Sequence, residues 1–126
     1  MRLEKTEMRD HRKLKAFQLA DTFVLAAHKG TKAFPRSEQS GLTSQLRRAA
    51  VSVAANIVEG SARNGEKDYV KFLGIAFAPL REAGYFIELA GKLGYLEPAA
   101  TKDLLAQYEH CARVLSGLVS SFREKY

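Results

Sequence analysis

The side chains best suited to catalysis or metal binding are few and follow no spacing typical of a reactive site. The sequence has three histidines, His11, His28 and His110, and a single cysteine, Cys111. A di-iron centre in a helical bundle needs Glu-x-x-His pairs on facing helices, and no glutamate here is followed by a histidine three residues later. No Ser-His-Asp or Cys-His arrangement and no glycine-rich phosphate loop can be assembled either. The sequence therefore predicts no enzyme, no metal or cofactor site and no small-molecule substrate.

A polar cluster formed by Asn56, Glu59 and Gly60 is another candidate site. Helix geometry places Asn56 at the edge of an apolar stripe and Glu59 on its flank. One interpretation makes the cluster a ligand site. In the other, Asn56 and Glu59 bond backbone groups or arginines across a contact between protomers, and Gly60 caps the helix in the left-handed conformation. We favour the second, structural interpretation, because buried polar groups usually serve to satisfy one another.

Basic side chains could neutralise the phosphates of a nucleic acid. The formal net charge is +6, and residues 1–36 hold nine Lys and Arg against four Asp and Glu. Within one protomer the basic residues form no single patch, but repetition around a ring would produce a basic band. Charge runs are more often solvated faces or ion-pair partners, so this site is an alternative. The candidates are Arg12, Lys13, Arg47, Arg48, Arg63, Lys67 and Lys71.

Four segments position these side chains, and each repeats apolar residues at three- and four-residue steps, as amphipathic helices do. We expect helices over about residues 13–31, from Leu42 to near Gly60, from about Glu66 to before Gly94, and from Pro98 onward. Short connections between them predict an all-α, antiparallel up-down-up-down four-helix bundle. Residues 1–12 are expected to form a flexible basic arm, and residues 13–126 the bundle domain.

Pro79 lies within the third predicted helix. Proline removes one backbone donor and leaves the carbonyl of Ile75 without its usual partner, so the helix should bend. Two separate helices meeting at Pro79 are the alternative. Because the apolar repeat continues in phase across the proline, we expect one helix with a kink near Pro79. Gly84 and Gly91 either weaken this helix or make room for a neighbour.

The apolar stripes also predict which side chains face the core. In the first helix Phe23 is expected to flank the stripe. In the last helix Val119 is expected to lie beside it. Aromatic side chains beyond the core stripe of the third helix suggest packing between protomers, with Phe77, Tyr85 and Phe86 as candidates. The predicted core residues are Leu14, Phe17, Ala20, Val24 and Ala27 in the first helix, and Leu104, Tyr108, Cys111, Leu115, Leu118 and Phe122 in the last.

Cysteine usage and hydropathy indicate the compartment. One cysteine permits no intrachain disulfide, so a reducing environment is the simplest expectation. The charged start has no apolar segment typical of a signal peptide. The most apolar run, residues 49–55, is far shorter than the roughly 20 residues of a membrane-spanning helix. We expect a cytoplasmic protein with no membrane contact.

Five segments occur in an order and at separations that together form a recognisable pattern. They are Arg12-Lys-Leu-Lys15, Gly41-Leu-Thr-Ser-Gln-Leu-Arg-Arg-Ala-Ala50, Ala55-Asn-Ile-Val-Glu-Gly60, Phe72-Leu-Gly-Ile-Ala76 and Leu93-Gly-Tyr-Leu96. These segments resemble those of the 23S rRNA intervening-sequence proteins, also called S23 ribosomal proteins. The resemblance implies a bacterial, intracellular four-helix bundle that assembles as a ring-like pentamer and whose biochemical role is mostly unassigned. Accessory variability proteins of diversity-generating retroelements are similar in fold, and bind nucleic acid and a reverse transcriptase.

The chain departs from the family pattern at three places. Met8-Arg-Asp10 resembles the usual family start, so Met1 to Glu7 is either an extension or the product of an upstream start codon. Val58 stands where the family more often has alanine, and Ala78-Pro-Leu80 replaces a stretch that is usually Gly-Ser-Leu. The last difference puts a straight third helix in doubt.

Two functions remain after these observations. The leading hypothesis is a non-enzymatic, self-associating four-helix bundle that serves as a scaffold or binding module. The alternative is an accessory protein that binds RNA or DNA through basic residues repeated around an oligomeric ring. A bundle enzyme is a third, less favoured hypothesis, because no reactive site is recognisable.

Overall fold

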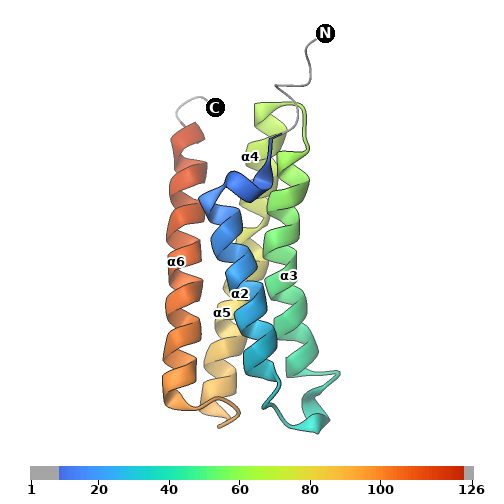
Figure 1. Cartoon of the computed structure of the whole chain (residues 1–126), viewed down its shortest axis with the longest axis vertical. Coiled ribbons are helices and arrows are strands. Elements are labelled where there is room, and N and C mark those ends of the chain that lie inside the picture. Colours follow the sequence, from blue (N-terminus) through green and yellow to red (C-terminus); the bar gives the residue numbers. More distant parts are fainter. Residues whose placement is uncertain (1–8, 124–126) are drawn as a thin grey trace.

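A computed structural model describes residues 9–123 of the chain, and these residues form one helical bundle (Figure 1). Each of the four predicted helices is present. The third is divided into two consecutive segments. The elements are η1 (His11–Lys13), α2 (Lys15–Thr31), η2 (Arg36–Glu38), α3 (Leu42–Ser61), α4 (Glu66–Ile75), α5 (Phe77–Lys92) and α6 (Pro98–Arg123).

The helices run alternately down and up, as Figure 1 shows. α3 packs against both α2 and α5, and α6 packs against the same two helices from the other side. The bundle is therefore a square in which α2, α3, α5 and α6 follow one another around the axis. This arrangement confirms the predicted antiparallel up-down-up-down bundle, which short connections favour because each helix must return beside its predecessor.

The kink predicted near Pro79 is present, and it falls one turn earlier, at Ala76. The amide of Ala76 donates to two carbonyls, those of Phe72 at 3.2 Å and Leu73 at 3.3 Å. The ladder then resumes with the amide of Leu80 donating to the carbonyl of Ala76 at 3.2 Å. A proline ring clashes with the carbonyl four residues before it, here that of Ile75, so the helix opens in the turn preceding the proline.

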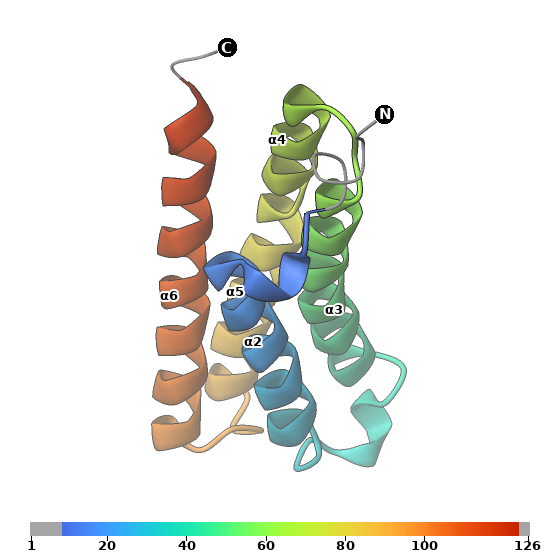
Figure 2. The ribbon, with the colours of Figure 1, turned by 45° about the horizontal axis from the view of Figure 1, so that its top comes forward.

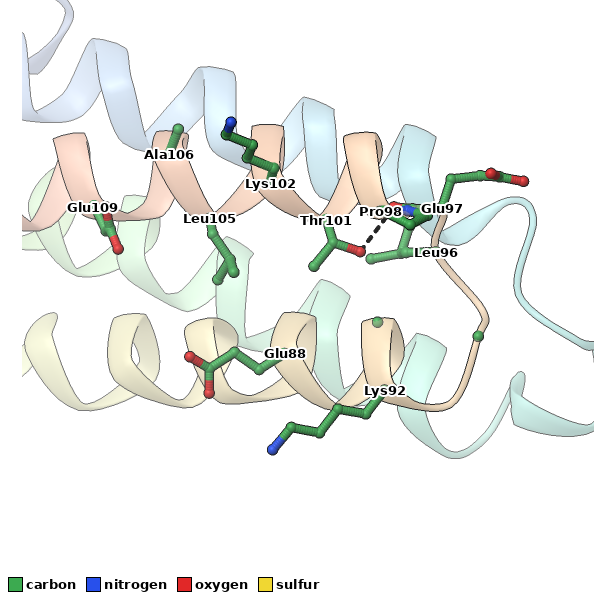
Figure 3. Close-up of a pocket in the computed structure, with 12 residues that line it drawn as sticks. Glu88, Lys92, Leu96, Glu97, Pro98, Thr101, Lys102, Leu105, Ala106 and Glu109 are labelled. Atoms are coloured by element: carbon green, nitrogen blue, oxygen red, sulfur yellow. Dashed lines mark hydrogen bonds between the residues drawn. The ribbon is translucent and has the colours of Figure 1, made fainter.

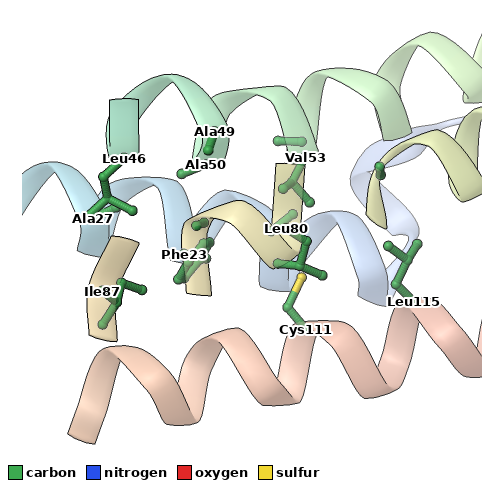
Figure 4. Close-up of a cluster of buried hydrophobic side chains, with 14 of the residues drawn as sticks. Phe23, Ala27, Leu46, Ala49, Ala50, Val53, Leu80, Ile87, Cys111 and Leu115 are labelled. Carbon is green, nitrogen blue, oxygen red and sulfur yellow. The ribbon is translucent and has the colours of Figure 1, made fainter. Parts of the chain in front are cut away.

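The core alternates large side chains with alanines, which allows the four helices to approach closely (Figure 4). Phe23 is completely buried at its centre. The prediction that Phe23 flanks the stripe of α2 is therefore wrong, and Val24, which is half-buried, is the flanking residue. The buried stripe of α2 keeps Ala20 and Ala27 from the prediction but is turned toward Phe23, and it consists of Ala16, Ala20, Phe23, Ala27 and Thr31.

The buried stripe of α6 differs from its prediction in the same manner. Val119 is buried, whereas Leu118 and Phe122 are half-buried. Apolar residues at neighbouring positions leave the exact orientation of a helix open, because either position completes a three- and four-residue repeat. The packing of the other three helices selects between them.

Two glycines of α5 mark the places where α6 comes closest. A Cβ atom built on Gly84 would lie 2.7 Å from Cζ of Tyr108, and one on Gly91 would lie 2.9 Å from Cγ2 of Thr101. Both distances are too short for real atoms. Of the two predicted roles for these glycines, making room for a neighbour is therefore the one that the structure supports.

The start of the described chain is docked on the bundle (Figure 2). The guanidinium of Arg9 lies 4.2 Å from the ring centroid of Tyr69, and its Nη1 donates to the carbonyl of Arg63 at 2.9 Å. Asp10 caps the short helix η1 by accepting from the amide of Arg12. Most of the predicted flexible arm lies outside the described residues, whereas Arg9, Asp10 and Arg12 make these contacts. The flexibility of the arm stays a prediction.

Glu38 joins two loops at the opposite end of the bundle. Its Oε1 accepts from the amide of Leu42, the first residue of α3, at 3.0 Å. Its Oε2 accepts from the hydroxyl of Tyr95, in the connection before α6, at 2.9 Å. The Leu42 amide and then the Tyr95 hydroxyl lower the pKa of Glu38, because both bonds favour the carboxylate. The bond to Glu38 raises the pKa of Tyr95.

We predict that stability falls in acid partly through Glu38. Because its folded-state pKa lies below the ordinary value of 4.5, its contribution is present above about pH 4.5 and is lost as the pH falls through the folded-state pKa. Thermal unfolding between pH 7 and 3 should show a smaller loss of Tm for Glu38→Gln than for the wild type. Equal pH dependence of the two proteins would contradict this role, and Glu97→Gln, at an exposed loop position, is the matched control.

Candidate binding surfaces

A wide groove lies between the lower halves of α5 and α6 (Figure 3). It encloses about 1000 Å³. Its floor is apolar or small, with Gly91, Leu96 and Leu105, and Thr101 turns its hydroxyl back to the carbonyl of Glu97 at 2.9 Å. The groove can therefore accept an apolar or small-residue surface.

Charged side chains line only the edges of this groove. Glu88 and Lys92 stand on the α5 edge, and Lys102 and Glu109 on the α6 edge, all of them exposed. Figure 3 shows these four side chains spread along the groove, with no common point toward which they converge. A catalytic or ligand site needs convergent polar groups, and these four side chains do not form such an arrangement.

Within residues 9–123, no group of three or more His, Cys, Asp or Glu side chains could hold a metal ion. Cys111 is completely buried on the core side of α6, and burial raises the pKa of its thiol to about 11. The thiol is therefore neutral at physiological pH and is unsuited to act as a nucleophile. No described helix is long and apolar enough to cross a membrane.

A second hollow, of about 590 Å³, lies above the first and is also formed between α5 and α6. Phe77 and Leu80 line it from α5, and Tyr108, Ala112 and Gly117 from α6. Tyr108 lies over Gly84, between the upper and lower hollows. We use "α5–α6 groove" for the two hollows together.

A separate groove lies on the next side of the square, between α3 and α5. It encloses about 460 Å³. Arg48 and Ser52 line it from α3, and Pro79, Glu82 and Phe86 from α5. We call it the α3–α5 groove.

The three aromatic residues predicted to lie between protomers do not share one surface. Phe77 lines the α5–α6 groove and Phe86 lines the α3–α5 groove, because nine residues place them about 180° apart around the helix. Tyr85 points outward between them and is 57% exposed, with its ring centroid 6.0 Å from that of Phe86. A role in oligomer contacts stays a prediction, and any such contact would have to involve two sides of the bundle.

Asn56 and Glu59 make local contacts in and just after α3. The amide nitrogen of Asn56 donates to the carbonyl of Ser52 at 2.9 Å, one turn earlier. Glu59 is exposed and forms an ion pair of 2.7 Å with Arg63, one turn later. These bonds satisfy the polar groups of Asn56 and Glu59, as the favoured structural interpretation expects. They differ from it because both partners belong to the same chain and not to two protomers.

Gly60 is not a left-handed cap, and that prediction is wrong. α3 continues through Gly60 to Ser61, and the positive φ among the described residues belongs to Gly94, at +81°. Gly60 is instead the point where α4 crosses α3: a Cβ there would lie 2.9 Å from Cβ of Phe72. This position therefore requires glycine because it has no side chain, and not because of its backbone freedom.

Arg47 differs from the other basic candidates because it fastens two helices together. Its Nε donates to Oγ1 of Thr31 at 2.7 Å, and its Nη2 donates to the carbonyl of His28 at 3.3 Å. Both acceptors lie at the end of α2, where carbonyls lack helical partners. Arg47 therefore closes the end of α2 against α3.

The remaining basic candidates fall into two groups. Arg12 pairs with Asp10 at 2.9 Å, and the guanidinium of Arg63 lies 4.5 Å from the ring centroid of Phe72 while pairing with Glu59. The second group consists of exposed residues on the surface, namely Lys13, Arg48, Lys67 and Lys71.

Sequence reasoning missed two residues that organise these surfaces. Arg9, which docks the N-terminal segment on Tyr69, has no signal in a charged stretch without periodicity. Tyr108 was assigned to the core of α6, but it lies half-buried at the groove wall. The sequence signal that could have placed Tyr108 was the pair Gly84 and Gly91. Glycines seven residues apart lie on one face of a helix and indicate that a neighbouring helix approaches closely there.

By its fold this chain belongs to the class of small antiparallel four-helix bundles. Its described residues form surface grooves and include no group of side chains that could hold a metal ion. The chain belongs to the 23S rRNA-intervening sequence protein family, whose model matches residues 12–117. Its fold is similar to that of a protein of unknown function from the S23 ribosomal protein family of Bacteroides thetaiotaomicron. The TM-score is 0.75 at 17% identity, over 83% of this chain and 95% of that one. No curated protein matches the chain.

We predict that Gly60→Ala destabilises the protein by about 1–3 kcal/mol, because the new methyl group would overpack the contact between α3 and α4. Chemical denaturation followed by circular dichroism measures the change. Gly74→Ala is the matched control, since Gly74 lies within α4 with open space around its missing Cβ. It should leave stability unchanged or raise it by up to about 1 kcal/mol. Equal effects of the two substitutions would refute the crossing role of Gly60.

Proposed function

We propose that this protein is a non-enzymatic, self-associating four-helix bundle that acts as a scaffold or binding module in the bacterial cytoplasm. The observation that carries the proposal is the outer face of α3, which we define by Arg48, Val51, Ala55, Val58 and Ala62. These residues repeat at three- and four-residue steps on the side of α3 away from the core.

The outer face of α3 carries exposed apolar side chains beside few charges. The 20 residues of α3 include three charged side chains, those of Arg47, Arg48 and Glu59. Val51 is 45% exposed, although the opposite side of the same helix already fills the core. A helix that is apolar on both sides is usually covered on both sides. A second copy of the chain would supply that cover.

Other elements of the bundle also carry exposed apolar residues. Ile75 in α4 is 43% exposed, Tyr85 in α5 is 57% exposed, and Leu93 after α5 is 50% exposed. Apolar area distributed over two sides of a bundle suits an assembly of several copies better than a single two-fold contact. We propose a ring of five copies, the number that the family resemblance implies.

A second candidate function is binding of RNA or DNA. The observation that favours it is the set of exposed basic residues that make no ion pair among the described contacts, Lys13, Arg48, Lys67 and Lys71, in a chain of net charge +6. Repeated around a ring, Lys67 and Lys71 of every copy would fall at the same end of the assembly. Regularly spaced cations of this kind suit a phosphate backbone.

We predict that light scattering coupled to gel filtration gives a mass about five times that of the 14.0-kDa chain. Val51→Lys should shift the protein toward lower mass, because it places a charge within the apolar contact. Thr22→Lys on α2, also at an exposed position, is the control and should leave the mass unchanged. A protomer mass for the wild type at high micromolar concentration would refute self-association.

We predict that any nucleic-acid affinity falls steeply with salt, since each neutralised phosphate releases counterions. Lys67→Ala combined with Lys71→Ala should flatten the slope of log Kd against log salt by about one to two units per protomer engaged. These lysines are better targets than Arg47 or Arg63, whose removal would also break contacts within the bundle. Lys92→Ala, on the α5 edge of the groove, is the control. No binding at low salt would refute this candidate function.

A further inference from the structure

We infer that the upper hollow of the α5–α6 groove is a binding site for a small organic phosphate that carries a planar ring, the chemistry of a nucleoside monophosphate. This inference goes beyond the proposed function and does not depend on it. The hollow lies between α5 and α6, whereas the surface proposed for self-association is the outer face of α3. Three features of the hollow carry the inference: its charges, its unpaired donors and its aromatic lining.

Both charged side chains that line the upper hollow are cations. Arg81 comes from α5 and Arg113 from α6, and no aspartate or glutamate is among the lining residues. Neither arginine makes a hydrogen bond or an ion pair among the described contacts. Two guanidinium groups at one hollow attract anions, and arginine is the side chain best suited to bind phosphate through two parallel bonds.

The two arginines lie at nearly the same height along the bundle. α5 and α6 are antiparallel, and Tyr108 lies over Gly84. Arg81 is three residues before Gly84, so its level on α6 is three residues after Tyr108. Arg113 lies two residues beyond that level, which corresponds to about 3 Å of helix rise. An arginine side chain is longer than this offset, so both guanidinium groups can reach one anion in the hollow.

The carboxylates closest to these arginines in the sequence line other hollows. Glu82 follows Arg81 directly, but it lines the α3–α5 groove on another side of α5. Glu109 lies one turn before Arg113 and lines the lower hollow. The described contacts include no ion pair between Glu109 and Arg113. The positive charge of the upper hollow is therefore not neutralised by a carboxylate that lines it.

Two hydroxyl groups at the same hollow are also available to a ligand. Tyr108 and Ser116 line it from α6, and neither side chain makes a hydrogen bond among the described contacts. The hydroxyls of Ser61 and Ser121, by contrast, donate to carbonyls of their own helices at 2.9 and 2.6 Å. A phosphate group has three strong acceptor oxygens and a charge of about −1.5 to −2 at pH 7. It therefore matches two arginines and two hydroxyls better than a singly charged carboxylate does.

The rest of the lining is apolar and suits a planar ring. Phe77 and Tyr108 are half-buried aromatic residues, and Leu80, Ala112 and Gly117 complete the hollow. Its volume of about 590 Å³ is typical of small-ligand sites. Aromatic side chains bind planar rings by stacking, with little dependence on which base the ring is. A ligand with both groups would use the cations and the apolar lining, whereas inorganic phosphate would use the cations alone.

Isothermal titration calorimetry at about 0.15 M salt tests the site. The probes are the adenosine, guanosine, cytidine and uridine monophosphates and phenyl phosphate. At least one of them should bind with a Kd below about 1 mM. Adenosine, which lacks the phosphate, and inorganic phosphate, which lacks the ring, should bind at least about tenfold more weakly than that probe. No binding of any ring-bearing phosphate, or equal affinity for adenosine or inorganic phosphate, would overturn the inference.

Substitutions at the two arginines test which residues bind the phosphate. Arg81→Gln and Arg113→Gln should each weaken binding about tenfold or more, because each removes hydrogen bonds between oppositely charged groups. Tyr108→Phe keeps the ring and removes the hydroxyl, so it should weaken binding only about threefold to tenfold. Arg48→Gln makes the same change at an exposed arginine of the α3–α5 groove and should leave the affinity unchanged. Equal losses at Arg48, Arg81 and Arg113 would show a general attraction of anions and would refute the site.

NMR spectroscopy of the wild type locates the bound ligand. Addition of the tightest-binding probe should shift the amide signals of Gly84, Ala112 and Gly117, and should leave that of Gly30, at the lower end of α2, in place. Shifts confined to another surface would contradict the assignment. A 5′-phosphorylated oligonucleotide that binds at these residues more tightly than every monophosphate would assign the hollow to a nucleic acid and overturn the small-molecule ligand. Circular dichroism of every variant confirms that the bundle is folded.

Discussion

The close approach of helices at residues with little or no side chain is the constraint on which this structure depends. α4 crosses α3 at Gly60, and α6 lies against α5 at Gly84 and Gly91. Alanines occupy many of the remaining core positions, interleaved with large side chains such as Phe23 and Leu115. Such interiors are close-packed, so a single added methyl group is felt across the contact. The positions of the grooves follow from these contacts, because they fix how far apart neighbouring helices lie.

The core uses one side of each helix, and α3 has more apolar surface than that side needs. Its inner stripe of Leu46, Val53 and Ile57 is completely buried. Its outer face repeats small apolar residues over the same length. A self-contained bundle would place charged residues there, as α6 does with Lys102, Asp103 and Arg113. The surplus on α3 connects the packing of one chain to the assembly proposed for several.

The polar side chains of the bundle mostly serve its ends. Arg47 closes the end of α2, Glu38 holds the start of α3 and the connection before α6, and Arg9 docks on Tyr69 at the opposite end. Helix ends carry backbone groups without intrahelical partners, and these side chains supply partners for several of them.

The sequence by itself determined the number of helices, their order, the kink before Pro79 and the family, because apolar periodicity, turn residues and proline stereochemistry are local properties. It could not determine the orientation of each stripe, so Phe23 and Val119 were placed on the flanks when they belong to the core. It also could not distinguish a glycine needed for its backbone from one needed for its small size, as at Gly60. The tertiary structure decided these points, because the direction a side chain faces and the space it may occupy are set by helices distant in the sequence.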